Sequence, residues 1–330
     1  MTEGNGELMT TGPGRGNDRA GARSQAIRTR RAEIARVIDR YRETHDDGAT
    51  PVPGLAVGRA TSPIPPTSYL FEPSLCISAR GSKRVRLGEE DYVYDEDHFL
   101  LTAVGLPTII EVRKASAAAP YAAIQIALDL SVAKQVIADI DVHGLSSQTT
   151  ETGIATGPVD AELLDAVVRL VRLLEKPRDI PVLQRLIHRE ILYRVLVGPA
   201  GARLRQMVQI GTQSNRVAKA IDRLRRDFSK RLSVEELAAE SGMGVSTLHH
   251  HFRELTTMSP LQFQKQLRLH EARRLMLSEH ADAGTAALRV GYESPSQFNR
   301  EYRRLFGAPP ARDVKALRGT TSVEAPHRIA

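Results

Sequence analysis

The chain has 330 residues, of which 41% are hydrophobic, and it carries a net charge of +7 and one cysteine. This length exceeds what a single hydrophobic core usually serves, so we expect two domains. One cysteine excludes an intramolecular disulfide and a cysteine-rich metal site. No apolar run approaches the roughly 20 residues of a membrane span, and the first residues lack the order of a signal peptide. We therefore expect a cytoplasmic protein without a membrane partner.

The excess positive charge lies in the C-terminal third of the chain. Residues 215–320 contain 19 Lys and Arg against 12 Asp and Glu, whereas the remaining residues contain 27 of each. Nucleic-acid binding requires a local basic surface, which a high overall charge alone does not supply. The C-terminal third is therefore the part expected to bind nucleic acid.

Two segments precede the first predicted strands. Residues 1–24 are rich in Gly, Thr and Asn and poor in apolar side chains, so we expect a disordered tail. Between Ala26 and Thr44 apolar residues recur at helical spacing, and arginines crowd the opposite face. The spacing predicts an amphipathic helix. Packing of this helix on its own domain is favoured over the alternative, a basic arm on DNA.

Short β-rich runs, separated by Gly, Pro and acidic turns, follow between residues 51 and 140. They predict a small antiparallel barrel or sandwich, which together with the first helix makes an N-terminal domain over residues 25–145. The expected strands are Ser68–Phe71, Leu75–Ala79, Arg84–Leu87, Asp91–Tyr94, Phe99–Val104, Thr108–Val112 and Tyr121–Leu128. In the run Lys83–Leu87 the alternation places Val85 and Leu87 on one face and the basic residues on the other.

Residues 158–198 have the spacing of two amphipathic helices, with Pro177 and Pro181 between them. A helix pair appended to a small barrel has a broad apolar stripe, part of which is available to a partner. We therefore predict a dimerisation element here, and a homodimer. The sequence Gly198–Gly201 ends the second helix, and residues 199–214 are expected to serve as a connector.

An internal repeat marks the C-terminal third. Gly242 and Gly291 each follow the end of a predicted helix and precede an apolar residue. The apolar positions that follow have the same spacing in both copies: Leu248, Phe252, Leu255 and Pro260 correspond to Phe298, Tyr302, Leu305 and Pro310. A helix, a glycine turn and a second helix make a helix-turn-helix unit, whose second (recognition) helix enters the major groove of DNA. We predict two such units, at about 233–255 and 283–305.

One continuous helix is predicted between the two units, from Pro260 to about Ser278. Its roughly 19 residues would span about 28 Å at about 1.5 Å per residue. That length approaches the roughly 34 Å between successive major-groove faces on one side of B-DNA. One chain could therefore read two adjacent major grooves.

The segment SGMGVSTLHHHFRELTTMSPLQFQKQLRLHEARRLML, followed by RVGYESPSQFNREYRRLFGAPP, closely resembles the AraC/XylS family of bacterial regulators. The resemblance implies a DNA-binding domain over residues 215–314 and leaves 315–330 as a tail. The segment PSLCISARGSKRVRLGEEDYVYDEDHFLLTAVGLP resembles the cupin-like N-terminal domain of one branch of this family. The implied fold class is α+β and multidomain: an N-terminal cupin-like β-barrel with flanking helices and a C-terminal all-α tandem helix-turn-helix domain. The implied function is transcription regulation under the control of a small-molecule effector bound in the barrel.

The family implies that the exposed early positions of both recognition helices face DNA bases. These base-reading candidates are Ser246, Thr247, His249, His250, Ser296, Gln297, Asn299 and Arg300. Arg300 and Gln297 suit bidentate reading of guanine and adenine, respectively. The phosphate candidates, which lie further along the helices, are Arg253, Arg303 and Arg304. The implied partner is a double-stranded DNA operator, and contact with RNA polymerase is an open alternative.

Two departures from the family pattern concern a helix end and a helix interface. Thr257 stands where the family usually has a glycine, so the first recognition helix must end without that cap. Ala283, Gly284 and Ala286 offer small side chains where bulky apolar ones are usual. We therefore expect the second unit to be the looser one until DNA orders it.

No metal, cofactor or catalytic site is expected. Consecutive helical residues point about 100° apart, which argues against convergence of the run His249–His251 on one ion. Residues 51–140 contain only His98, too few histidines for a catalytic cupin centre, and no phosphate-binding loop or nucleophile–base set is recognisable. We therefore expect a binding pocket and no enzyme. The residues that could line the pocket are Tyr69, Phe71, Cys76, Phe99, Glu111 and Tyr121. Ordinary core packing is favoured over a pocket role for them, and Cys76 is expected to be a buried inert thiol.

Two other functions compete with transcription regulation. One is a cupin-type enzyme with a basic C-terminal domain, which the scarcity of histidine disfavours. The other is an architectural DNA-binding protein, which would bind without sequence preference.

Overall fold

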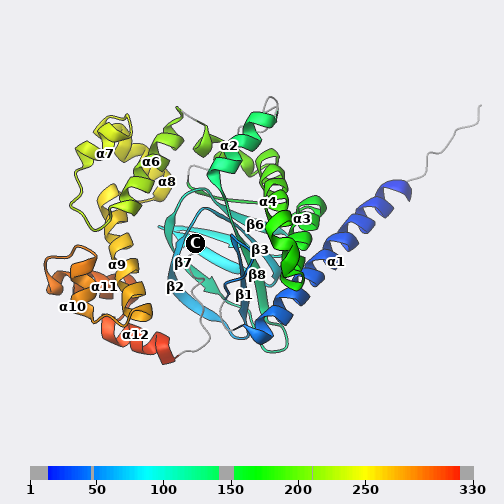
Figure 1. Cartoon of the computed structure of the whole chain (residues 1–330), viewed down its shortest axis with the longest axis horizontal. Helices are drawn as coiled ribbons and strands as arrows, with labels where there is room; N and C mark the ends of the chain where they lie inside the picture. The colour runs from blue at the N-terminus through cyan, green and yellow to red at the C-terminus, as the bar shows by residue number, and fades with distance from the viewer. Residues whose placement is uncertain (1–13, 46–47, 141–151, 210, 320–330) are drawn as a thin grey trace, which may run out of the picture.

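The computed structural model describes residues 14–45, 48–140, 152–209 and 211–319. These residues form an N-terminal β-sandwich covered by helices and a C-terminal array of helices (Figure 1). The predicted fold class is thus confirmed. Of the two predicted β architectures the sandwich is correct, because the strands form two facing sheets and not a closed barrel.

The sandwich is built from two antiparallel sheets. The strands are β1 (Leu55–Ala60), β2 (Ile64–Phe71), β3 (Ser74–Arg80), β4 (Lys83–Leu87), β5 (Glu90–Tyr94), β6 (His98–Thr102), β7 (Leu106–Val112), β8 (Tyr121–Ala127) and β9 (Ile154–Pro158). Sheet 1 has the order β1-β8-β3-β6-β9, and sheet 2 has the order β2-β7-β4-β5. Every predicted strand is present. The outer strands of sheet 1, β1 and β9, escaped prediction because Gly58 and Gly157 interrupt their apolar pattern.

Strand β4 places Lys83 on an unexpected face. Val85 and Leu87 are fully buried, and a residue two positions earlier in a strand points to the same side. Lys83 therefore faces the space between the sheets, whereas Arg84 and Arg86 face outward. The prediction that all basic residues of this run share the outer face is wrong for Lys83, because the alternation of the strand assigns it to the inner one.

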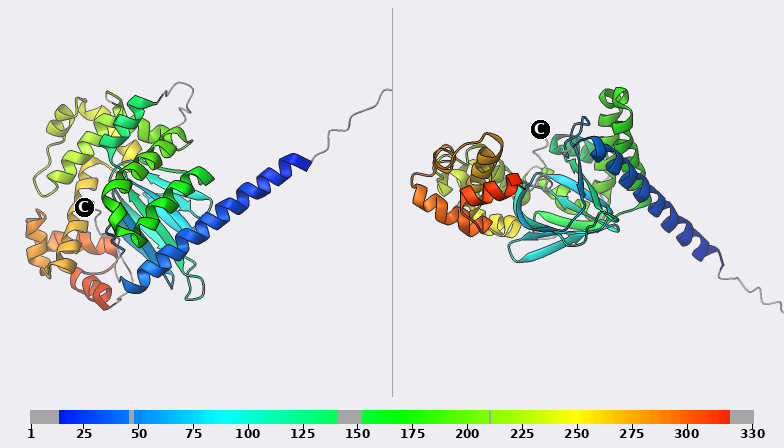
Figure 2. Two further views of the ribbon diagram at one scale, coloured as in Figure 1. Left: turned by 45° about the vertical axis from the view of Figure 1, so that its right-hand side comes forward. Right: turned by 90° about the horizontal axis from the view of Figure 1, so that it is seen from below.

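Helix α1 (Gly14–Thr44) starts earlier than predicted. Its C-terminal half packs on sheet 1 and buries Ile34, Val37 and Ile38, as expected for a helix that packs on its own domain. Its N-terminal half projects away from the rest of the molecule (Figure 2). The expected disorder is wrong for residues 14–24, because extending a nucleated helix costs far less than starting one. The rest of that predicted tail, residues 1–13, lies outside the described residues.

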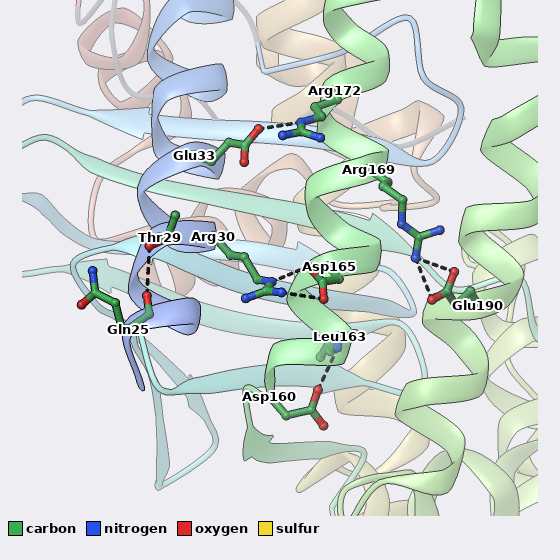
Figure 3. A network of polar contacts seen from close by, with 10 residues as sticks. All are labelled: Gln25, Thr29, Arg30, Glu33, Asp160, Leu163, Asp165, Arg169, Arg172 and Glu190. Atoms are coloured by element: carbon green, nitrogen blue, oxygen red, sulfur yellow. Dashed lines mark hydrogen bonds and ion pairs between the residues drawn. The ribbon is translucent and has the colours of Figure 1, made fainter. Parts of the chain in front are cut away.

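Helices α3 (Ala161–Arg172) and α4 (Ile180–Val197) form the predicted pair, joined by two 3-10 turns, Leu173–Glu175 and Pro177–Asp179. Ion pairs join α1 to α3 and α3 to α4 (Figure 3): Arg30 with Asp165, Glu33 with Arg172, and Arg169 with Glu190. Exposed pairs of this kind contribute about 0–1 kcal/mol each. They orient α1 more than they stabilise the fold.

Two helices of the N-terminal half were not expected. Helix α2 (Leu130–Asp139) follows β8 and is capped by Asp129, whose carboxylate accepts two backbone N–H bonds. Helix α5 (Gly201–Val208) lies within the predicted connector 199–214 and buries Leu204, Met207 and Val208. The connector is therefore a packed element. The Gly-Pro sequence ends α4, but the apolar residues that follow it form another helix.

The C-terminal helices are α6 (Gln213–Arg226), α7 (Val234–Glu240), α8 (Val245–Thr256), α9 (Pro260–Ser278), α10 (Ala283–Arg289), α11 (Pro295–Phe306) and α12 (Pro310–Gly319). Helices α7 and α8 form the first predicted unit, and α10 and α11 form the second. Helix α9 runs between the two units and has 19 residues (Figure 1). The predicted tail 315–330 begins inside α12, which is held by the ion pair of Asp313 with Arg273.

Among the described residues, the two larger of three clusters of buried hydrophobic side chains separate the two helix-turn-helix units. One extends from the sandwich through α5 and α6 into the first unit and ends at Leu267 in α9. The other begins at Leu269 and packs α10, α11 and α12 on the second half of α9. Between them Arg268 donates to the carbonyl oxygens of Phe228, at 2.7 Å, and Gly291, at 2.9 Å. The first unit thus shares its hydrophobic core with the N-terminal domain, whereas the second unit has a core of its own and touches the sandwich where α11 meets β2.

Candidate DNA-binding surface and effector cavity

Helix α8 has one buried and one exposed face. Leu248, Phe252 and Leu255 are buried, and the helix packs on α6, α7 and α9. The residues predicted to contact DNA from this helix are all exposed: Ser246, Thr247, His249, His250 and Arg253. The helical periodicity thus places these side chains on the surface that is open to a ligand.

Helix α11 repeats this arrangement. Phe298 and Tyr302 are buried, and with Tyr292 they form an aromatic cluster with ring centroids 5.3 and 5.5 Å apart. The side chain of Ser294 caps the helix by accepting the backbone N–H of Gln297. The residues predicted to contact DNA are again all exposed: Ser296, Gln297, Asn299, Arg300, Arg303 and Arg304. Both recognition helices therefore present their predicted DNA-contacting side chains to solvent.

The side chain of Gln297 is engaged within its own helix. Its Nε2 donates to Glu301 Oε1 at 3.1 Å, and Lys265 Nζ from α9 lies 3.0 Å from the same oxygen. The hydroxyl of Tyr292 donates to the other oxygen at 2.7 Å. Burial opposes ionisation of Glu301, but these hydrogen bonds lower its pKa on balance. Glu301 thus anchors α11 to α9, and Gln297 must exchange one bond to read a base.

Two histidines of α8, His250 and His251, lie close to a common carboxylate, although consecutive residues of a helix point in different directions. His250 Nε2 lies 3.1 Å from Glu254 Oε1, and His251 Nδ1 lies 2.7 Å from Glu254 Oε2. One donor atom from each of these three residues lies within 4.8 Å of the others. The sequence argument against convergence overlooked Glu254, which lies one turn further on and reaches both imidazoles. The absence of a metal from this protein stays a prediction.

Helix α8 ends at Thr257, which adopts the left-handed conformation with φ 60°. Helix α11 ends at Gly307 with φ 80°. A β-branched residue is strained in this region, whereas glycine is not. The first recognition helix thus ends without a glycine, as expected, but Thr257 takes the same backbone conformation at its own cost. Its N–H donates to Arg253 O at 2.7 Å.

Three contacts hold α8 and the neighbouring helix α6 against the sandwich. The N–H of Gly153, just before β9, donates to Leu255 O at 2.8 Å. The β4–β5 turn touches Thr257 so closely that a Cβ on Gly88 would lie 2.7 Å from Thr257 Oγ1. The third contact is the ion pair of Arg225 in α6 with Glu72 after β2. A shift within the sandwich therefore reaches the first recognition helix directly.

A cavity of about 50 Å³ lies between the two sheets. The predicted pocket residues that line it are Tyr69, Phe71, Cys76 and Tyr121. Phe99 and Glu111 are absent from the lining: Leu100, next to Phe99, pairs with Cys76 on the inner face, and Glu111 faces outward to accept Arg84 Nε at 2.8 Å. Phe99 is packed in the core, the reading that was favoured for it, and Glu111 lies outside the lining, because neighbouring residues of a strand point to opposite faces.

Four polar residues of the lining escaped the sequence prediction: Arg59, Lys83, Tyr94 and Gln125. The hydroxyl of Tyr121 donates to that of Tyr94 at 3.2 Å, and the hydroxyl of Tyr69 donates to Gln125 Oε1 at 3.2 Å. The alternation of β4 carried the signal for Lys83. No such indication existed in the sequence for Gln125, because a polar residue within an apolar strand is normally predicted to face solvent.

Cys76 is a buried thiol within this lining. Burial raises its pKa to about 11. The thiol is therefore protonated at neutral pH, which agrees with the expected lack of reactivity.

The chain thus combines a β-sandwich with two helix-turn-helix units, which is the architecture of a two-domain helix-turn-helix protein. Residues 51–203 match the family described as "AraC-type transcriptional regulator N-terminus", and residues 237–316 match the family described as "Helix-turn-helix domain". The chain belongs to the AraC/XylS family of transcriptional regulators.

Individual relatives resemble parts of the chain. The transcriptional regulator CdhR of Pseudomonas aeruginosa is 30% identical over 115 residues, which cover 35% of this chain and 34% of CdhR. The transcriptional activator RhaS of Salmonella schwarzengrund is 27% identical over 160 residues, which cover 48% of this chain and 56% of RhaS. The chain therefore spans only part of the length of these relatives.

A solved structure resembles the chain over most of its length. ToxT from Vibrio cholerae O395 superimposes with a TM-score of 0.51 and 10% identity, covering 81% of this chain and 98% of ToxT. At this identity the likeness shows the shared fold. Within the described ranges, no helix has both the length and the apolar character needed to cross a membrane.

Proposed function

We propose that this protein is a sequence-specific DNA-binding regulator of transcription, controlled by a small molecule that binds between the two sheets. The observation that carries the proposal is the exposure, on α8 and α11 alike, of every side chain expected to contact DNA. Helix α9, with 19 residues, separates the two helices along about 28 Å, which suits adjacent major grooves. The net positive charge of residues 215–320 supports binding to the phosphates of DNA.

Selection of DNA by the full chain from randomised duplexes tests this function. We expect enrichment of a motif with two half-sites whose centres lie about 10–10.5 base pairs apart, since that is the spacing of successive major-groove faces. An architectural DNA-binding protein would retain duplexes without enriching a motif. Catalytic turnover by the purified chain would favour the enzyme alternative.

The remaining parts of the proposal concern location and chemistry. We propose a cytoplasmic protein, as is expected of a regulator that binds chromosomal DNA. We also propose that it lacks catalytic activity, because the described lining of the cavity offers two cations, Lys83 and Arg59, and no nucleophile paired with a base. Contact with RNA polymerase belongs to the same proposal, for a regulator that acts at promoters.

The exposed face of α4 supports the proposal of a homodimer. Val182, Leu186 and Tyr193 are 67%, 62% and 40% exposed, and their spacing of four and seven residues places them on one face of the helix. Leu183, 40% exposed, lies beside them. A contiguous apolar face on a helix that is otherwise packed is typical of a protein contact surface. We propose that α4 packs on α4 of a second chain.

Replacing Leu186 with glutamate is expected to weaken dimerisation by roughly tenfold or more, because the dimer would bury an unpaired charge. Sedimentation equilibrium over a range of protein concentrations measures the effect. Leu261→Glu is the matched control, since Leu261 is 51% exposed but lies on α9. Equal association of the two variants would show that α4 is not the interface.

A further inference from the structure

Lys83 is a partly buried cation on the inner face of β4, and no acidic side chain of the described residues is its partner. It lies on the inner face of β4 with the fully buried Val85 and Leu87. Its Nζ lies 5.6 Å from the centroid of the Tyr121 ring, a distance typical of a cation–π contact. No acidic side chain in the described ranges forms an ion pair with it. A charge in this position is costly unless a counter-charge accompanies it.

The surroundings of Lys83 are otherwise neutral. The described lining of the cavity contains neither Asp nor Glu, and its other cation, Arg59, is paired with Asp39 at 2.8 Å. Burial raises the pKa of the phenol of Tyr121 and of the neighbouring Tyr94, as it does for the thiol of Cys76. These groups are therefore protonated at neutral pH. Lys83 is the one uncompensated charge of the described lining, and burial lowers its pKa accordingly.

We propose that this cavity binds a short monocarboxylic acid, whose carboxylate pairs with Lys83 and whose apolar end packs on the aromatic lining. This inference rests on the proposed function of the cavity as the effector site and names the class of effector. One carboxylate matches one free ammonium, whereas a phosphate ester would bring more charge than one lysine neutralises. Phenol hydroxyls can donate to the same carboxylate.

The size of the cavity sets the size of the acid. A water molecule requires roughly 10–15 Å³ of such space, and the cavity offers about 50 Å³. The space therefore suits a chain of a few carbon atoms. Butyrate is the probe of choice, and butyramide is its neutral counterpart of nearly the same shape.

Calorimetric titration of the full chain with butyrate and with butyramide tests the proposal. We expect butyrate to bind at least about tenfold more tightly, because a charge-assisted pair with Lys83 is worth more than a neutral hydrogen bond. Lys83→Met should remove this preference, and Lys83→Arg should retain part of it. Arg86→Met, on the outer face of the same strand, is the matched control and should keep the preference. Equal binding of the two probes to the wild type would overturn the proposal.

A second readout needs no ligand. Lys83→Met removes an uncompensated charge from the interior, so the free variant is expected to melt at a higher temperature than the wild type. A lower melting temperature would contradict the absence of a counter-charge. DNA selection with the wild type, run separately, reports on the regulator function. Equal binding of butyrate and butyramide to a wild type that still selects a DNA motif would refute the effector class alone.

Discussion

Replacing Arg300 with alanine is expected to weaken binding to the selected duplex by about 1–3 kcal/mol and to relax base preference at one position. The reason is geometric. Arg300 is exposed in the second turn of α11, a position from which we expect contact with base edges, and a guanidinium can donate two parallel hydrogen bonds to guanine. Titrations with the selected duplex and with a scrambled duplex of equal length measure the effect.

Arg303→Ala is the matched control for Arg300→Ala. Arg303 is also exposed but lies almost one turn further along α11, where phosphate contact is expected. Its loss should weaken both duplexes alike and reduce the slope of log affinity against log salt by about 1. If Arg300→Ala also weakened both duplexes alike, Arg300 would be a phosphate contact and not a base reader.

Replacing Gly291 with alanine is expected to destabilise the second unit by about 2–5 kcal/mol, the sum of a strained backbone and an overpacked contact. Gly291 has φ +89°, and a Cβ at this position would lie 2.1 Å from the carbonyl oxygen of Ser229. The collision is with backbone, so no side-chain rotation relieves it. Urea unfolding, followed by a probe in the second unit, measures the loss.

Gly242 provides the control for Gly291, because it occupies the corresponding turn of the first unit. Its φ is +66°, but a Cβ there would meet nothing within 4 Å. Gly242→Ala should therefore cost only the conformational part, about 1–2 kcal/mol. Equal losses for the two variants would mean that the Ser229 carbonyl moves aside easily and that the packing argument fails.

The C-terminal helices were predictable because their signals are local. Helix, glycine turn and helix follow one another within some twenty residues, and the buried positions Leu248, Phe252 and Leu255 repeat at helical spacing. The same periodicity identified which side chains of α8 and α11 are exposed. What the sequence could not reveal is the bond between Gln297 and Glu301, because it depends on how α11 packs on α9.

The N-terminal domain was harder to predict because its signals are non-local. Strand β9 pairs with β6 across more than fifty residues of sequence, and its own five residues include Gly157. Since neighbouring residues of a strand point to opposite faces, strand positions known only to within a few residues could not decide whether Phe99 and Glu111 face the cavity. Lysine is usually found at the protein surface, so Lys83 was predicted to face solvent. Its position on the inner face is nevertheless the feature on which the proposed effector class depends.

The hydrophobic interior is divided at Arg268. Substitutions in α8 and in α11 therefore differ in whether they can also affect the N-terminal domain. Substitutions in α8 are made in an element that shares its packing with the ligand-binding domain. Substitutions in α11 are made in a body with a core of its own. Exchange of residues 269–319 between relatives should therefore yield chimaeras with a new preference at one half-site and an unchanged response to effector. Operator preference can diverge in one half-site while the sensing mechanism stays as it is.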